Sequence, residues 1–211
     1  MGKLSSEECR RLFKKYGIPI VDQLFVKDRK GLDKLRLRFP VVMKVESPDI
    51  IHKTEAHCVI LNIGDRKELA EAWDKILRNA RAYKRDAKIE GVVVQEQASG
   101  YELIIGGKLD EQFGPVVLFG AGGIFTELLK DTSIRICPLT REDAEEMISE
   151  VKFSKVLDGF RGEQPIDKAK VISTIMNVCS MMCREHIKEL DINPFMASPE
   201  GVKAVDVRII K

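Results

Sequence analysis

The pattern of expected elements changes near residue 97, and this change constrains the fold more than any other feature. Before it, helical and strand patterns alternate: Leu69, Trp73 and Ile76 recur at helical spacing after Asp65, which predicts a long helix with Trp73 in its core. After it, closely spaced strands with glycine-rich turns predict an antiparallel sheet. We expect an α/β lobe over 1–96 and an α+β lobe over 97–211, with Gln95, Glu96 and Gln97 as the hinge.

The remaining elements follow from caps, turns and apolar spacing. Ser5 and Glu8 form a capping box, so a helix is expected to Tyr16, with Gly17 as its stop. In the first lobe we also expect strands over 18–26, 41–45, 59–63 and 91–97 and a short helix over 27–37. In the second lobe we expect strands over 101–106, 115–119, 124–129 and 133–138, a helix capped by Thr140, a loop over 158–167, a helix over 168–185, and a terminal hairpin over 190–210.

Composition excludes several classes of protein. The chain has 211 residues with 44% hydrophobic and 32% charged residues, which is typical of a folded globular protein. Its net charge is +2 with acids and bases mixed, so we expect neither nucleic acid nor an anionic membrane as a partner. A charged amino terminus and the lack of a long apolar run predict no signal peptide and no membrane span, hence a cytoplasmic location.

Five cysteines favour buried thiols in a reducing compartment. They are scattered in apolar contexts and odd in number. Cys179 and Cys183 are four residues apart on an expected helix and offer half of a metal site. Because no second Cys/His pair accompanies them, the pattern does not favour structural zinc.

The stretch 39–59 holds the first candidate site. A buried strand ends at Lys44, a turn with Ser47 and Asp49 follows, and His52 and Lys53 stand side by side. Two cations and an imidazole around a turn are suited to phosphate. Taken singly, however, a lysine after a strand is usually solvated and a lone histidine is usually structural.

The terminal hairpin holds the second candidate site. Asp191 and Asn193 are two residues apart and share one face of a strand, and Asp206 lies on the returning strand near Asn193. Oxygen ligands that converge in this way suit Mg²⁺. The alternative is that both acids face solvent and pair with Arg208 or Lys203.

A glycine-rich turn at 120–123 is the third candidate. Glycines such as Gly122 and Gly123 allow close backbone approach, so their N–H groups can hold a phosphate. The turn lacks the lysine of a P-loop and the helix of a dinucleotide-binding fold. Glu127 and Asp131, which follow, are either ligands or exposed acids.

Taken together, these segments resemble a known family. The motifs PVVMK, SPDIIHKTE, GVVVQE, GYELIIG, QFGPVVLFGAGGIFTELLKD, PLT, GFRG, ELDINP and AVDVR are similar, in order and over nearly the whole chain, to the ATP-grasp beta subunit of ADP-forming acetate–CoA ligases. Succinyl-CoA synthetase is a more distant relative. The resemblance implies an ATP-grasp fold of two lobes with the nucleotide in the cleft between them.

The resemblance also implies an activity and its partners. Such enzymes interconvert acyl-CoA, ADP and phosphate with free acid, CoA and ATP. A CoA-binding alpha subunit forms an acyl phosphate, and the phosphoryl group passes through histidines to ADP. The family suggests an α2β2 assembly with ATP/ADP and Mg²⁺ as the bound cofactors.

By the same resemblance, roles fall on particular residues. His52 matches the phosphohistidine of the HK motif, and Lys44 matches the lysine that binds the nucleotide phosphates. Glu96 matches the adenine hinge, with Glu102 just beyond it. Asn193 and Asp206 match the magnesium ligands.

One departure concerns His57 and Cys58, which stand where the family usually has two glycines. His57 is therefore an alternative to His52 as the relay residue. Two rival functions also remain open at this point: a stand-alone ATP-grasp ligase that uses an acyl phosphate, and a non-catalytic subunit that senses ATP.

Overall fold

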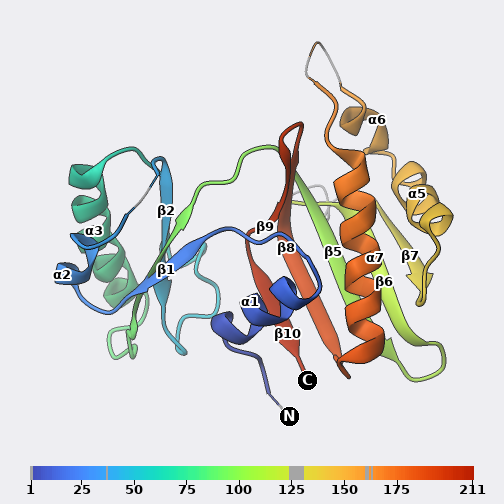
Figure 1. Ribbon diagram of the computed structural model, residues 1–211. Helices are drawn as coiled ribbons and strands as arrows, with labels where there is room; N and C mark the ends of the chain where they lie inside the picture. Colours follow the sequence, from blue (N-terminus) through green and yellow to red (C-terminus); the bar gives the residue numbers. More distant parts are fainter. Residues whose placement is uncertain (1, 37, 124–130, 160–161, 163) are drawn as a thin grey trace. The chain divides into compact units, whose positions relative to one another are not determined.

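The chain folds into two compact units. The computed structural model describes residues 2–36, 38–123, 131–159, 162 and 164–211 (Figure 1). The large unit comprises Met1–Ile20 and Ala98–Lys211, and the small unit comprises Val21–Gln97. The division expected from the sequence placed the first twenty residues with the first lobe. They join the large unit because Cys9, Leu12 and Phe13 belong to its hydrophobic core.

The large unit is built on an antiparallel six-stranded sheet. Its strand order is β10-β8-β5-β6-β7, and β9 also pairs with β8. The register places Leu103 beside both Phe195 and Ala121, and all three are buried. The strands are β5 (Tyr101–Asp110), β6 (Gly114–Ala121), β7 (Thr132–Ile136), β8 (Glu189–Ser198), β9 (Gly201–Ala204) and β10 (Val207–Ile210).

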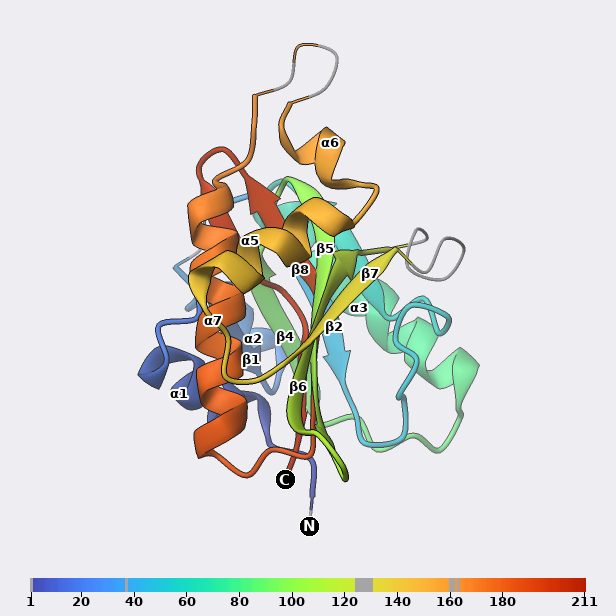
Figure 2. The same ribbon diagram turned by 90° about the vertical axis from the view of Figure 1, so that its right-hand side faces the viewer.

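Helices cover one face of this sheet. Figure 2 shows α1, α5 and α7 on the same side of it. The capping box predicted at Ser5 is present, and the cap predicted at Thr140 is present as a box with Asp143; each satisfies backbone groups at a helix start. Burying each large aliphatic side chain of α7 contributes about 1.5–3 kcal/mol. The helices are α1 (Ser6–Lys15), α5 (Arg141–Glu150), α6 (Ser154–Leu157) and α7 (Lys168–Arg184).

The small unit is an antiparallel four-stranded sheet with two helices packed on one face. Its strand order is β1-β4-β2-β3. Trp73, Ile76 and Leu69 of α3 pack on the sheet and are buried, as their spacing predicted. The elements are β1 (Gln23–Val26), α2 (Arg29–Leu32), β2 (Val41–Glu46), β3 (Val59–Ile63), α3 (Arg66–Tyr83) and β4 (Gly91–Glu96).

Some elements differ from their expected extents. The strand expected over 18–26 is reduced to β1, and the helix expected over 27–37 is the single turn α2, which contains Gly31. The returning strand of the terminal hairpin is divided into β9 and β10 by Val205 and Asp206. The strand expected over 124–129 lies outside the described residues. Among the residues that are described, no helix combines the length and apolar character needed to cross a membrane.

Candidate functional site

The break in the terminal hairpin places three oxygen-bearing residues close together. Asn193 donates its backbone N–H to the carbonyl of Asp206 at 3.1 Å. Asp191 and Asn193 alternate along β8 with the buried Leu190 and Ile192, so the two polar side chains share the outer face. The sequence prediction that Asp206 lies near Asn193 is therefore confirmed.

Electrostatics at the hairpin favour a cation. Burial, and next the neighbouring charge of Asp206, raise the pKa of the Asp191 carboxyl, while Arg208 partly opposes them. Arg208 has its ion pair with Glu189, at 3.7 Å. Two carboxylates that repel each other beside an amide oxygen form a donor set that fits Mg²⁺, because a bound cation relieves that repulsion.

In the small unit, Lys44 and Lys53 lie toward the sheet face opposite α3. Along β2, Lys44 and Glu46 alternate with Met43 and Val45, which are buried in the core under α3. The loop after β2 folds back so that the Lys53 ammonium forms an ion pair with Glu46 at 3.1 Å. The sequence reasoning missed Glu46, although its period-two spacing from Lys44 was a usable signal.

The loop that carries His52 is anchored through Asp49 and exposed at His52. Asp49 accepts hydrogen bonds from the Lys84 ammonium and the Lys88 N–H, both at 2.7 Å. The His52 side chain is 67% exposed, and its Nδ1 lies 3.8 Å from a carboxylate oxygen of Glu55. This separation is too long for a hydrogen bond, so the imidazole is accessible and Glu55 does not fix its tautomer.

Of the two residues that replace the family's glycines, His57 has a backbone conformation that favours glycine and Cys58 is buried. His57 has φ +51°, in the left-handed region, and its carbonyl accepts a hydrogen bond from Asn79 Nδ2 at 2.7 Å. The Cys58 side chain is fully buried in the core under α3, and burial raises the pKa of its thiol. Cys58 therefore packs as a small apolar residue and takes no part in surface chemistry.

The three expected hinge residues at the end of β4 differ in their contacts. Gln95 is only 2% exposed, and among the described residues its Nε2 is the buried side-chain polar atom without a hydrogen-bond partner. An unpaired buried donor is costly, so this atom suits an acceptor on a ligand. The Gln97 side chain, in contrast, already exchanges two hydrogen bonds with Asn62, at 2.7 and 2.6 Å. The Glu96 N–H donates to the Asp22 carbonyl at 3.0 Å.

The glycine turn lies against Glu102, so these predicted residues are neighbours. Gly122 donates its N–H to the Glu102 carbonyl at 2.8 Å, and a Cβ on Gly122 would lie only 2.8 Å from that carbonyl carbon. Gly123 has φ +61°, and a Cβ on it would lie 2.6 Å from the Glu102 carboxylate. Close packing thus requires glycine here, and the Gly122 N–H is not available for a phosphate.

Of the two acids that follow this turn, Asp131 has a structural role. It is buried, and its carboxylate accepts the N–H groups of Lys152 and Phe153, both at 2.8 Å. These bonds satisfy the backbone just after α5 and occupy the carboxylate, and the exposed-acid interpretation of Asp131 is wrong because the residue is buried. Glu127 lies outside the described residues.

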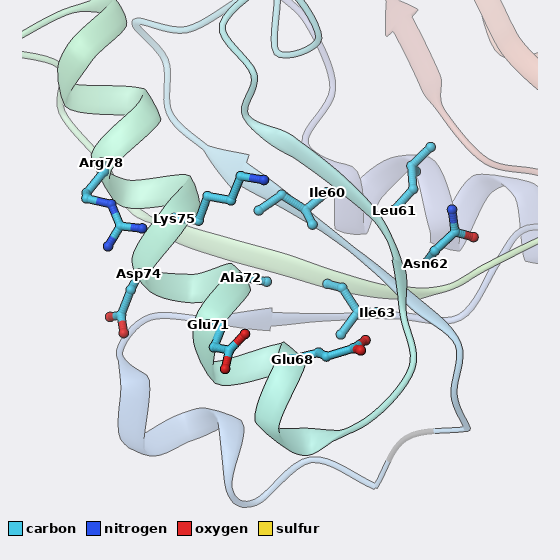
Figure 3. A pocket seen from close by; sticks show the side chains of 10 residues that line it. All are labelled: Ile60, Leu61, Asn62, Ile63, Glu68, Glu71, Ala72, Asp74, Lys75 and Arg78. Atoms are coloured by element: carbon cyan, nitrogen blue, oxygen red, sulfur yellow. The ribbon is translucent and has the colours of Figure 1, made fainter.

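A hollow of about 450 Å³ between β3 and α3 contains none of the predicted site residues (Figure 3). Its charged side chains have mixed signs, and several already have partners. Asp74 pairs with Arg29 at 2.9 Å, and Glu68 accepts the Gly64 N–H at 2.7 Å. Because charges of both signs line it, the hollow singles out neither an anionic nor a cationic ligand.

Comparisons with known proteins cover nearly the entire chain. The family described as "ATP-grasp domain" matches residues 1–210. The beta subunit of acetate–CoA ligase [ADP-forming] I from Pyrococcus furiosus is 42% identical, over 98% of this chain and 91% of that protein.

Two similar solved structures are of acetyl-coenzyme A synthetase 1 from Ca. Korarchaeum cryptofilum. One, with coenzyme A, Ca-AMPCP and HgCl+, is 40% identical with a TM-score of 0.93, and the match covers 99% of this chain and 93% of that one. The other contains coenzyme A and Mg-AMPPCP, and its phosphohistidine segment points towards the nucleotide-binding site. It is 38% identical with a TM-score of 0.84, and the match covers 99% of this chain and 92% of that one.

Proposed function

This chain belongs to the ATP-grasp family of ADP-forming acetate–CoA ligase beta subunits, and from that premise we propose that it binds ADP and ATP. The enzyme it serves converts acyl-CoA, ADP and phosphate into free acid, CoA and ATP, and the reverse. The observation that carries this proposal is the 42% identity to a subunit beta, which spans nearly the full length of both chains. Its partner is a CoA-binding alpha subunit, in an α2β2 assembly.

We propose His52 as the residue that carries the phosphoryl group. Its exposure on an anchored loop leaves the imidazole accessible to a phosphoryl donor. In the forward direction a ring nitrogen of His52 attacks phosphorus, a new N–P bond forms, and the bond to the donor oxygen or nitrogen breaks. A β-phosphate oxygen of ADP then attacks the same phosphorus and the N–P bond breaks, which regenerates neutral His52.

Cationic side chains compensate charge on the phosphates. Lys44 and Lys53 are the proposed phosphate-binding residues, and the ion pair with Glu46 holds Lys53 in position until an anion competes for it. Among the hinge residues Gln95, Glu96 and Gln97, the unpaired Nε2 of Gln95 gives the strongest support for contact with a base. Glu102, Gly122 and Gly123 complete the proposed set, with the two glycines shaping the backbone.

Asp191, Asn193 and Asp206 are the proposed Mg²⁺ ligands. Their carboxylate and amide oxygens are the hard donors that this ion prefers. Burial is the main cause of the raised pKa of Asp191, and the charge of Asp206, which a cation would offset, adds to it. When bound, Mg²⁺ neutralises negative charge on the nucleotide phosphates.

The test measures ATP formation by the chain together with an alpha subunit. Acetyl-CoA, ADP, phosphate and Mg²⁺ are supplied, and ATP is followed over time. We expect His52→Ala to abolish ATP formation, because no other group then carries the phosphoryl group. The matched control is His57→Ala, five residues along the same loop, which should retain most of the activity.

Three outcomes would contradict this proposal. Unimpaired ATP formation by His52→Ala would remove His52 from the relay. ATP-dependent ligation by the chain alone would instead indicate a stand-alone ligase. ATP binding with no phosphoryl transfer in the presence of the alpha subunit would indicate a sensing subunit.

A further inference from the structure

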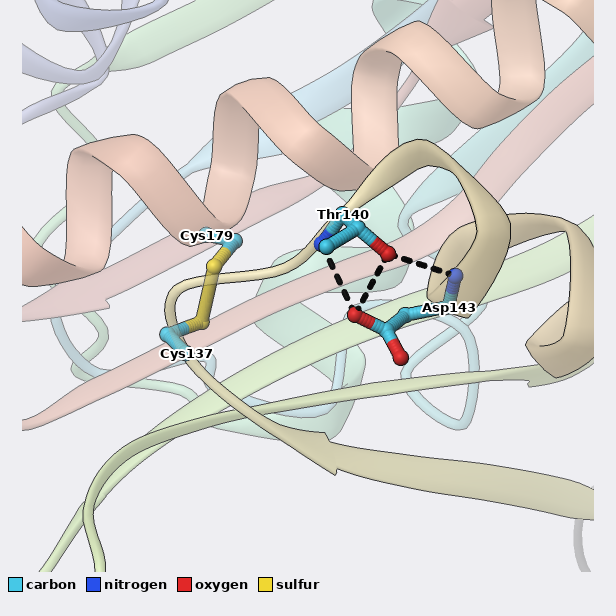
Figure 4. The surroundings of a disulfide bond; sticks show 4 residues. All are labelled: Cys137, Thr140, Asp143 and Cys179. Carbon is cyan, nitrogen blue, oxygen red and sulfur yellow. Dashed lines mark hydrogen bonds between the residues drawn. A yellow bond between two sulfur atoms is a disulfide. The ribbon is translucent and has the colours of Figure 1, made fainter.

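Three cysteines of the large unit meet at a place that the proposed function does not use. Cys179 and Cys183 are one turn apart on α7, and Cys137 directly follows β7. The three Sγ atoms all lie within 4.8 Å of one another. Cys137 and Cys179 form a disulfide, with a Cα–Cα distance of 5.7 Å (Figure 4), and Cys183 is a free thiol. We call these three residues the cysteine triad.

The triad combines two fixed sulfur atoms with one that is accessible. Cys137 and Cys179 are 7% and 2% exposed and belong to the hydrophobic core of the large unit. The Cys137 backbone is also held by a hydrogen bond from its N–H to the Pro115 carbonyl at 2.8 Å. Cys183 is exposed, so the triad can be reached from solvent.

We propose that the cysteine triad, in its reduced form, binds one soft metal ion of the thiolate-preferring d10 class, such as Zn²⁺ or Cd²⁺. A disulfide uses only two sulfur atoms, whereas a third thiol within 4.8 Å supplies the number of protein ligands found in open zinc sites. Metal–sulfur bonds of about 2.3 Å place ligand sulfurs roughly 3.8–4.0 Å apart, so the triad needs only side-chain adjustments.

Loading begins with reduction of the disulfide. Two electrons from a thiol or phosphine reductant, with two protons from that thiol or from water, break the Cys137–Cys179 bond and give two thiols, and the reductant is oxidised to a disulfide or a phosphine oxide. The metal ion then displaces the protons of the three thiols, which pass to water. No fourth Cys, His, Asp or Glu joins the triad within the described part of the chain, so water takes the remaining position.

Cadmium titration of the reduced full-length chain tests this proposal without any activity assay. The protein is reduced with a phosphine, freed of reductant without air, and titrated with Cd²⁺ alone while the ultraviolet band of cadmium thiolate is recorded. We expect one ion per chain and affinity at least about tenfold weaker in Cys183→Ser. Cys58→Ala, which removes a buried thiol of the small unit, is the matched control and should bind like the parent chain.

Two outcomes of the Cd²⁺ titration would exclude the metal site. The site is excluded if the folded, reduced chain fails to bind Cd²⁺, or if Cys183→Ser binds it with parental affinity. Because Cys183 is exposed, its replacement should leave the circular dichroism spectrum unchanged. Reoxidation with a thiol oxidant should abolish binding and reduction should restore it, and binding that survives reoxidation would overturn the proposal.

Discussion

Gln95 is a residue at which stability and ligand binding should oppose each other. Its Nε2 is buried without a partner, which costs about 1–3 kcal/mol in the free protein. Gln95→Met keeps the length of the side chain and removes the amide. We expect the free energy of unfolding without nucleotide to rise by roughly 1 kcal/mol and ADP affinity to fall about tenfold. Denaturant unfolding and calorimetric titration measure the two effects.

Gln97→Met is the control for that substitution. The Gln97 amide has its partners on Asn62, so its removal should lower stability, by about 1 kcal/mol. A Gln95→Met protein that is less stable than its parent and binds ADP unchanged would show that the amide has no ligand-directed role.

The difference between these residues could not be predicted from the sequence. Gln95, Glu96 and Gln97 look equivalent as a polar end to a strand, but Gln97 is occupied by Asn62, 35 residues away. Asp131 likewise accepts bonds from a backbone turn 21 and 22 residues further on. Strand periodicity gives the side of the sheet on which a residue lies, whereas its partners depend on tertiary packing.

At the scale of elements, Glu185 joins α1 to the end of α7. Its carboxylate accepts the Lys15 ammonium at 2.6 Å, the Tyr16 hydroxyl at 3.0 Å and the Lys211 ammonium at 3.1 Å. The hydrogen bond from Lys15, and then those from Lys211 and Tyr16, lower the pKa of this carboxyl from 4.5 to about 2. Glu185 thus connects three segments that are distant in sequence.

The lowered pKa of Glu185 predicts a pH-dependent contribution to stability. The unfolded chain binds a proton near pH 4.5 and the folded chain only near pH 2, so the contribution is complete above pH 4.5 and disappears toward pH 2. Because Lys15 is largely exposed, we expect Glu185→Gln to lower the free energy of unfolding at pH 7 by only about 1 kcal/mol.

Unfolding measured across this pH range checks the prediction. The difference between the parent chain and Glu185→Gln should shrink as the pH falls from 4.5 to 2. Glu145→Gln removes an exposed pair with Arg141 and should change stability by less than about 0.5 kcal/mol at any pH. A difference that stays constant with pH would show that the Glu185 charge does not matter.

Elements whose signals are local were predicted well. Three helices begin just after capping residues, which are Ser5, Asp65 and Thr140. Each cap depends on a contact between residues three positions apart in the sequence. The interruption of the returning strand at Asp206 was harder to predict, because its position is set by the pairing of β9 and β10 with β8. The same interruption brings Asp206 to Asn193, which the hairpin spacing had indicated.

At the scale of the whole molecule, the ATP-grasp fold implied by the order of motifs is confirmed by the match over residues 1–210 and by the likeness to related structures. It was harder to predict from the sequence which of the two units the first helix joins. Its apolar face of Cys9, Leu12 and Phe13 predicts packing but not the partner. Because β10 is the last strand of the chain, the contact of α1 with it joins the two ends of the sequence.

The grouping of α1 with the large unit predicts how fragments of the chain behave. A fragment of residues 21–97 retains the entire core beneath α3, so we expect it to fold alone. A fragment of residues 1–96 carries α1 without the core that buries it. An isolated helix of ten residues is marginal in water, so its amides should exchange freely while those of β2 and β4 stay protected.

Hydrogen exchange followed by mass spectrometry distinguishes the two divisions of the chain. Removal of residues 1–20 from the full chain should accelerate exchange in β10 and the end of α7, because Phe13 and the Lys15–Glu185 pair are lost there. Exchange in β2 and β4 of the same truncated chain serves as the internal control and should be unchanged. Protection of α1 in the 1–96 fragment would instead place that helix with the small unit, because only contacts within residues 1–96 would then account for it.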